Sequence, residues 1–261
     1  DTYGLDARVG SESRTLGRAL VGSVASGLDL YYDRLSSSAW TRLTDIGVTA
    51  FEPRGQYLDG SRYAQGGAFA NATVTLLRTL TWRAGVRVGF ARADAPADVQ
   101  SGSASVARTF LPYAGFFQGE LALSRGFSLI AGWDRSFRAP NLDDLTGRQQ
   151  SGPGFQFENA TLKPEIADTF EAGARLRSDT VVADAWVFQS NLDDAITRSV
   201  RLAEDCPPST PQCGASWNRF QLVNVAGRSV LRGVELSARV RLGPQWTVRT
   251  ALSHAIGDGP N

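Results

Sequence analysis

The strongest constraint in this sequence is a two-residue alternation of apolar and polar side chains that persists for about ten residues at a time. In TWRAGVRVGFAR, Val86 and Val88 share one face while Arg87 lies on the other, and the segments 127–138 and 233–242 alternate in the same way. Successive side chains of a β-strand point to opposite faces, so the pattern predicts strands. Strands of soluble proteins typically run about five or six residues, whereas a tilted strand needs about ten to cross a bilayer. We therefore predict an all-β chain of antiparallel transmembrane strands.

The spacing of these strands supports a barrel segment of about ten strands that belongs to a larger barrel. Turns of a few residues alternate with long connections at roughly 35–65, 92–108, 139–163 and 198–218. Short turns at one rim and long loops at the other are typical of outer-membrane barrels. A large soluble β-sandwich with long loops is the alternative. The predicted strands are 3–9, 17–34, 66–77, 80–91, 110–123, 127–138, 165–177, 181–197, 220–242 and 246–255.

The two faces of the predicted sheet suit two different surroundings. One face is small and aliphatic with aromatic residues near strand ends, as expected for contact with lipid, and includes Trp82, Val86, Val88, Leu129, Val234 and Leu236. The other face is charged, as expected for a water-filled lumen. The simpler role of these charged residues is cross-strand ion pairing, and the alternative role is contact with a substrate. The predicted lumen-facing residues are Arg83, Arg87, Asp134, Arg138, Glu171, Arg175, Glu235 and Arg239.

Composition excludes several classes of protein. Lys and Arg number 27 against 26 Asp and Glu, so the chain lacks the basic excess of a nucleic-acid-binding protein. No apolar stretch approaches the length of about eighteen residues that a membrane helix needs. The single histidine, His254, has no nucleophile elbow near it in the sequence, so no catalytic triad is predicted. We expect no enzyme activity, no catalytic residue, no metal site and no cofactor.

Two cysteines are the first and last residues of the short segment CPPSTPQC. Cys206 and Cys213 are close in sequence, and the prolines between them stiffen the loop. This arrangement predicts a disulfide formed outside the cytosol, with two free thiols as the alternative. Zinc binding is disfavoured because the sequence has no second pair of ligands.

Several motifs in the second half of the chain occur in an informative order. The strand 127–138 ends at FRAPNL, where Pro140 interrupts the ladder because it has no N–H group to donate. LKPE (162–165), TFEAGARL (169–176) and NLDDAI (191–196) follow, and then a GVEL strand. In order and spacing, these motifs closely resemble the TonB-dependent outer-membrane receptors. The resemblance covers nearly the whole chain.

The resemblance implies an outer-membrane receptor and active transporter for a scarce, bulky nutrient. The ligand of such receptors is most often a ferric chelate such as a siderophore, and TonB supplies energy through a plug domain inside the barrel. Neither a plug nor the terminal strands are visible, so residues 1–261 are expected to be part of the barrel of a longer, multi-pass protein of the bacterial outer membrane. A passive porin-like barrel is the alternative without energy coupling.

A haem receptor of the same family is a further alternative. Such receptors use FRAP and a nearby NPNL sequence with a histidine between them as iron ligand. Here FRAP occupies 137–140, the second element reads NATL at 159–162, and no histidine lies between the two. Tyrosine can also bind haem iron. The tyrosines that keep this alternative open are Tyr31, Tyr32, Tyr57 and Tyr63.

The long outer loops are the expected site of ligand capture. Long loops in compact folds are often functional, and the loop from Pro140 to Lys163 combines glycines with polar and aromatic residues. We predict that it contributes side chains that face the medium. The candidate ligand-binding residues are Arg148, Gln149, Gln150, Phe155 and Phe157.

Overall fold

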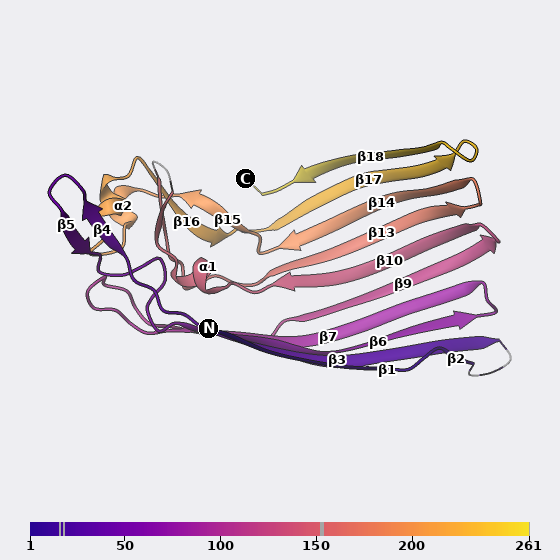
Figure 1. Cartoon of the computed structure of the whole chain (residues 1–261), viewed down its shortest axis with the longest axis horizontal. Helices are drawn as coiled ribbons and strands as arrows, with labels where there is room; N and C mark the ends of the chain where they lie inside the picture. Colours follow the sequence, from indigo (N-terminus) through magenta and orange to yellow (C-terminus); the bar gives the residue numbers. More distant parts are fainter. Residues whose placement is uncertain (16, 18, 152–153, 261) are drawn as a thin grey trace.

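Ten long strands form one antiparallel sheet in which each strand pairs with the next long strand along the chain (Figure 1). The computed structural model describes residues 1–15, 17, 19–151 and 154–260. This architecture confirms the predicted sheet, and within the described residues it does not close into a barrel. In sheet order the strands are β1 (Thr2–Gly10), β3 (Leu20–Arg34), β6 (Arg62–Leu76), β7 (Leu80–Ala95), β9 (Tyr113–Ser124), β10 (Phe127–Arg138), β13 (Glu165–Arg177), β14 (Val181–Asp193), β17 (Arg228–Arg241) and β18 (Thr247–Asp258).

The register sorts side chains onto two faces as the alternation predicted. Residues directly opposite one another on antiparallel strands share a face, and residues two apart on one strand do too. Following the ladder from Arg83 through Gln118, Gly132, Glu171 and Phe188 to Gly233 defines the polar face. All the predicted lumen-facing residues lie on it, and Trp82, Val86, Val88, Leu129, Val234 and Leu236 lie on the opposite, apolar face.

Spin labels placed singly at Val86 and Arg87 in the full-length protein should report opposite surroundings. We expect the Val86 label to collide with oxygen dissolved in lipid and the Arg87 label to collide with a water-soluble relaxation agent, because adjacent strand residues face opposite ways. A label at Val88, on the same face as Val86, is the matched control. Equal water accessibility at Val86 and Arg87 would contradict this register.

Two of the predicted strands are each divided into two strands. The predicted strand 181–197 is β14 followed by β15 (Ile196–Val200), and 220–242 is β16 (Asn218–Asn224) followed by β17. The breaks are turns at the same level of the sheet: Asp194 has φ +55° and Gly227 has φ +104°, and Asp193 pairs with Arg228. The predicted lengths of these two strands were therefore wrong, because the left-handed turns redirect the chain from the large sheet into a second sheet.

The long connections gather at one end of the sheet, at the left of Figure 1, while the short turns lie at the other end. The connection after β10 begins with helix α1 (Leu142–Thr146), whose N-terminus is capped by Asn141 and Asp144 in a reciprocal capping box. The long connection from Pro140 to Lys163 therefore contains regular structure of its own. The connection then forms β11 (Gln149–Ser151) and β12 (Gly154–Phe157). These belong to a four-stranded sheet in the order β11-β12-β16-β15, with β12 parallel to β16.

We call this end of the molecule the cap, and it has its own hydrophobic core. Leu58, Leu145 and Leu162 are at most 2% exposed and pack with Tyr63 and Ala93 from the ends of β6 and β7.

None of the helices in the described residues is long and apolar enough to cross a membrane. The remaining elements are β2 (Arg14–Thr15), β4 (Trp40–Leu43), β5 (Val48–Phe51), β8 (Val106–Phe110), η1 (Ala203–Asp205) and α2 (Pro211–Ala215).

Candidate functional site

A charged cavity lies where the polar face meets the cap. Its volume is about 420 Å³, and Asp29, Tyr31, Tyr63, Arg87 and Arg138 are among its lining residues. Two of them also contact the start of the cap. Arg138 Nη1 lies 2.7 Å from an Asp144 carboxylate oxygen in α1, and the Tyr63 hydroxyl donates to the Pro140 carbonyl oxygen, just before α1, at 3.4 Å. The cavity is therefore bounded by strands on one side and by the start of the cap on the other.

Three arginines of the polar face are held by carboxylates on other strands of the sheet, and the Arg87–Asp29 pair reaches from β7 across β6 to β3. Arg87 makes a bidentate pair with Asp29, with distances of 2.5 and 2.8 Å. Arg83 lies 3.1 Å from Glu120, and Arg175 lies 2.7 Å from Asp184. A bidentate guanidinium–carboxylate pair fixes geometry as well as charge, as for Arg87 and Asp29, while Arg83 and Arg175 each make a single contact that links adjacent strands. Of the predicted acidic residues, Glu171 accepts a weak hydrogen bond from Gln118 at 3.4 Å.

The FRAPNLDD motif and the glutamate of LKPE form a rim clasp that consists of Arg138, Asn141, Asp144 and Glu165. Arg138 at the end of β10 bonds to Asp144 in α1 and to Glu165 at the start of β13. Asp144 in turn accepts from the Asn141 backbone N–H at 3.0 Å, and Glu165 accepts from the Ile196 N–H at 2.7 Å. The unusual end of this strand is thus explained by one guanidinium that joins two strands and a helix.

Arg148 belongs to a buried ion cluster with Arg54 and Glu158. Its side chain pairs with Glu158 through two bonds of 2.6 and 2.5 Å, and it donates to the Ser101 carbonyl oxygen and to Thr210 Oγ1, both at 2.9 Å. Arg54 Nη1 lies 3.9 Å from Glu158. The cluster therefore joins four connections of the cap that are far apart in the chain.

The same cluster changes the acid–base properties of one member. Burial of Arg54 lowers the pKa of its guanidinium to about 10, because the charged form loses hydration. The negative charge of Glu158 opposes this shift, while the positive charge of Arg148 adds to it. Glu158 thus pairs with both buried guanidiniums, and the charge of Asp98 also favours the charged form of Arg54.

The expectation that Arg148, Phe155 and Phe157 face the medium is wrong. Arg148 is 7% exposed, while Phe155 and Phe157 are 5% and 4% exposed and pack with Cys213. The two phenylalanines are covered by the cysteine loop that packs on β12, and Arg148 is covered by the connections that carry its hydrogen-bond partners. Gln150 is exposed and Gln149 is half-buried, so these two amides remain available to a ligand.

Sequence reasoning missed Arg54 and Glu158 as members of a site. Each is a single charged residue in a long connection, without a period or motif that marks it. The partner strand of β12 was equally hidden: Gln221 in β16 donates to the Glu158 carbonyl oxygen across a separation of 63 residues. No local signal in the sequence identifies such a contact.

The cysteine loop packs against the buried aromatic residues of the cap. Cys206 and Cys213 are joined by a disulfide with a Cα–Cα distance of 5.9 Å, and Cys213 is fully buried. Thr210, inside the loop that this bond closes, accepts the hydrogen bond from Arg148. The disulfide loop and the ion cluster therefore support each other.

Comparison with known proteins supplies the family. Residues 1–259 match the family model described as TonB dependent receptor-like, beta-barrel. The chain belongs to this receptor family. Its members are proteins of the bacterial outer membrane, and the family and its structural neighbours are transport receptors. No curated protein matches the receptor chain.

Solved structures share the fold of the receptor chain at low sequence identity. The hemophore receptor HasR of Serratia marcescens, in complex with HasA and heme, is 18% identical with a TM-score of 0.75, covering 98% of this chain and 41% of that one. The copper transporter OprC is 19% identical with a TM-score of 0.71, covering 99% and 38%. A mutant of the ferric enterobactin receptor PfeA of Pseudomonas aeruginosa is 17% identical with a TM-score of 0.65, covering 98% and 36%. The receptor chain thus spans less than half the length of each of these proteins.

Reduction of the full-length receptor should add two alkylation sites, at Cys206 and Cys213. We expect neither thiol to react with iodoacetamide before reduction and both to react after it, as measured by peptide mass. On the chain-entropy model the bond contributes at most about 2–3 kcal/mol, because the closed loop is short. Reduction should therefore loosen the cysteine loop and leave the strands folded. Full labelling of both cysteines without reductant would contradict the disulfide.

Proposed function

We propose that this chain is part of the barrel of an outer-membrane receptor that imports a scarce, bulky nutrient, a ferric siderophore. TonB would supply the energy through a plug domain carried elsewhere in the same protein. The observation that carries this proposal is the family match over residues 1–259. Additional support comes from a polar cavity that opens beneath an ordered cap.

An exposed guanidinium in the cavity lining suits an anionic ligand. The lining contains the guanidinium groups of Arg8, Arg87 and Arg138. Arg87 and Arg138 are held by carboxylates, so Arg8 is the cation of the lining that is most open to a ligand. Although the Arg8 side chain pairs with Asp6, it is 72% exposed and can reach a ligand. Ferric siderophore complexes that carry negative charge match this lining, since complementary potentials speed encounter and reject the wrong partner.

A haem receptor is the second candidate, because two tyrosines line the same cavity as the FRAP residues. Tyr31 and Tyr63 lie there together with Phe137, Arg138 and Ala139. Tyrosine is an established haem ligand in proteins. Tyr31 is 40% exposed, whereas Tyr63 is buried, so Tyr31 would be the residue to reach the iron.

The test is an uptake assay with the full-length receptor in an iron-limited strain that lacks its own uptake receptors. Radiolabelled ferric siderophores and haem are offered separately, with and without functional TonB. We expect a ferric siderophore to accumulate only when TonB is present. TonB-dependent accumulation of haem that Tyr31→Phe abolishes would establish the second candidate, while accumulation without TonB would indicate a passive porin.

A further inference from the structure

The apolar face changes character at one row of the ladder. Toward the short turns, the row Ala131–Ala172–Val187–Val234 is wholly apolar up to β18, where His254 completes it. The next row toward the cap reads Trp133–Phe170–Gln189–Arg232–Ile256, and the row beyond it reads Arg135–Asp168–Asn191–Val230–Asp258. Toward the cap, small apolar side chains therefore give way first to aromatic rings and the Arg232 guanidinium, and then to a row with three charged side chains.

The height of Arg232 matches the edge of a membrane. Ten residues separate it from Leu242, which follows the other end of β17. At about 3.3 Å per residue and a tilt of about 40°, they span about 25 Å across the bilayer, the usual height of the apolar band of a barrel. With Leu242 at one boundary of the apolar band, the Arg232 guanidinium is therefore placed at the level of lipid headgroups on the side of the cap.

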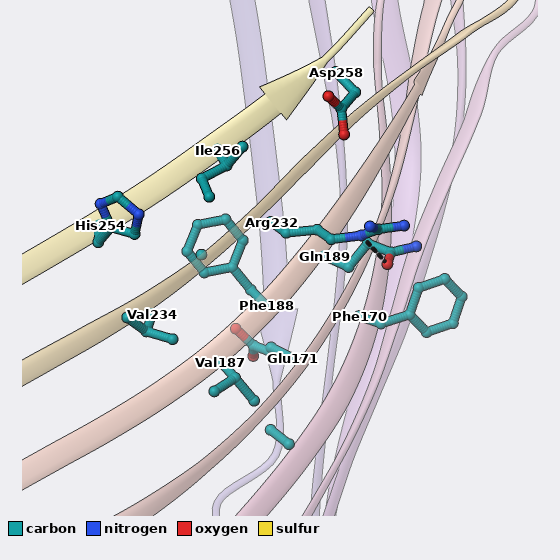
Figure 2. Close-up of a pocket in the computed structure, with 12 residues that line it drawn as sticks. Phe170, Glu171, Val187, Phe188, Gln189, Arg232, Val234, His254, Ile256 and Asp258 are labelled. Atoms are coloured by element: carbon teal, nitrogen blue, oxygen red, sulfur yellow. Dashed lines mark hydrogen bonds between the residues drawn. The ribbon is translucent and has the colours of Figure 1, made fainter.

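A groove of about 610 Å³ runs down the apolar face from this arginine (Figure 2). Phe170, Val187, Val234 and Ile256 from four neighbouring strands line it. Figure 2 shows the Arg232 and Gln189 side chains pointing toward one another, and Arg232 Nε donates to Gln189 Oε1 at 2.8 Å. The groove therefore combines apolar walls with a cation at its outer end.

Arg232 differs from its charged neighbours in lacking a carboxylate. Arg135 pairs with Asp168 at 2.8 Å, and Arg228 pairs with Asp193 at 2.9 Å. Within the described residues, no carboxylate oxygen lies within 4.0 Å of Arg232, although Asp258 lines the same groove. Its two terminal nitrogens are therefore available to an external anion, and guanidinium–phosphate contacts are among the strong charge-assisted hydrogen bonds.

We propose that this groove binds a phosphorylated lipid of the surrounding outer leaflet. An acyl chain would lie along Val187 and Val234, while the phosphate would accept hydrogen bonds from Arg232, which Gln189 orients. This inference requires only that the sheet spans the outer membrane, so it is independent of the transported nutrient. It assigns the outward-facing side of β13 to β18 a role separate from the cavity of the polar face.

The test uses the full-length receptor purified in detergent and incubated with bis-phosphorylated lipid A or with the same lipid lacking its phosphates. Native mass spectrometry measures the fraction of receptor that retains one lipid. We expect the wild type to retain the phosphorylated lipid and R232Q to lose about tenfold in that fraction, the effect of one charge-assisted hydrogen bond. R228Q, which alters an arginine of the same strand that pairs with a carboxylate, is the matched control.

Two further results make the outcome decisive. V234W, which fills the groove while leaving Arg232 in place, should also reduce retention, and every variant is first checked for the heat-modifiable migration of a folded barrel. Wild-type retention by both R232Q and V234W would overturn the proposal. Equal loss in R228Q and R232Q, or equal retention of the dephosphorylated lipid, would show general adhesion to the apolar face instead.

Discussion

Replacing Glu158 with alanine is expected to open the cap while the ten long strands remain folded. The side chains of Arg54 and Arg148 are 7% and 5% exposed, and Glu158 supplies the carboxylate that each of them faces. Removing one partner of a buried ion pair costs about 3–5 kcal/mol because a charge is left buried without compensation. Two guanidiniums would be affected here, so the connections that carry Ser101 and Thr210 should separate.

Hydrogen exchange on the full-length receptor can measure this opening. We expect amides of the cap peptides 96–105, 142–158 and 206–216 to exchange faster in the variant, while amides of β13 and β14 exchange as in the wild type. Glu204→Ala is the matched control, because Glu204 is exposed in the neighbouring connection. Unchanged exchange in the cap would mean that its hydrophobic core around Leu145 suffices without the ion cluster.

Deleting residues Gly147 to Gly154 from the full-length receptor should abolish nutrient uptake without unfolding the barrel. The deletion removes Arg148 from the ion cluster, together with β11 and the exposed Gln150. The strand ladder from β10 to β13 does not include these residues. Uptake of a labelled ligand should fall to background, while heat-modifiable migration on a gel stays that of the wild type.

The segment can act by binding ligand directly through its amides or by holding the cap together through Arg148. A double variant separates these two roles. Gln149→Ala combined with Gln150→Ala removes the available amides and keeps Arg148 in place. If the segment captures ligand directly, the double variant should lose affinity as the deletion does. Normal uptake by the deletion variant would remove the segment from the binding site, and loss of the folded band would show that the rim clasp needs it for stability.

The strands of this receptor chain could be predicted from sequence because their signal is local. Val86 and Arg87 alternate along a single strand, and the alternation alone predicts which face each side chain joins. The ten long strands, the up-and-down order and the family were confirmed. The prediction ran furthest past the observed strands where β15 and β16 continue β14 and β17 past a turn. Alternation persists there, and a positive φ at Asp194 or Gly227 leaves little trace in the sequence.

The cap could not be predicted because its contacts join residues that are distant in the chain. Arg148 is a charged residue in a long polar loop, which predicted a role in ligand binding. Its contacts with Glu158, Ser101 and Thr210 bury it instead. The sequence by itself determined the strands, their faces and the family, since a two-residue period needs only neighbouring residues. The tertiary structure alone decided which loop side chains are buried and which remain available, because that choice depends on how separate connections pack over one end of the sheet.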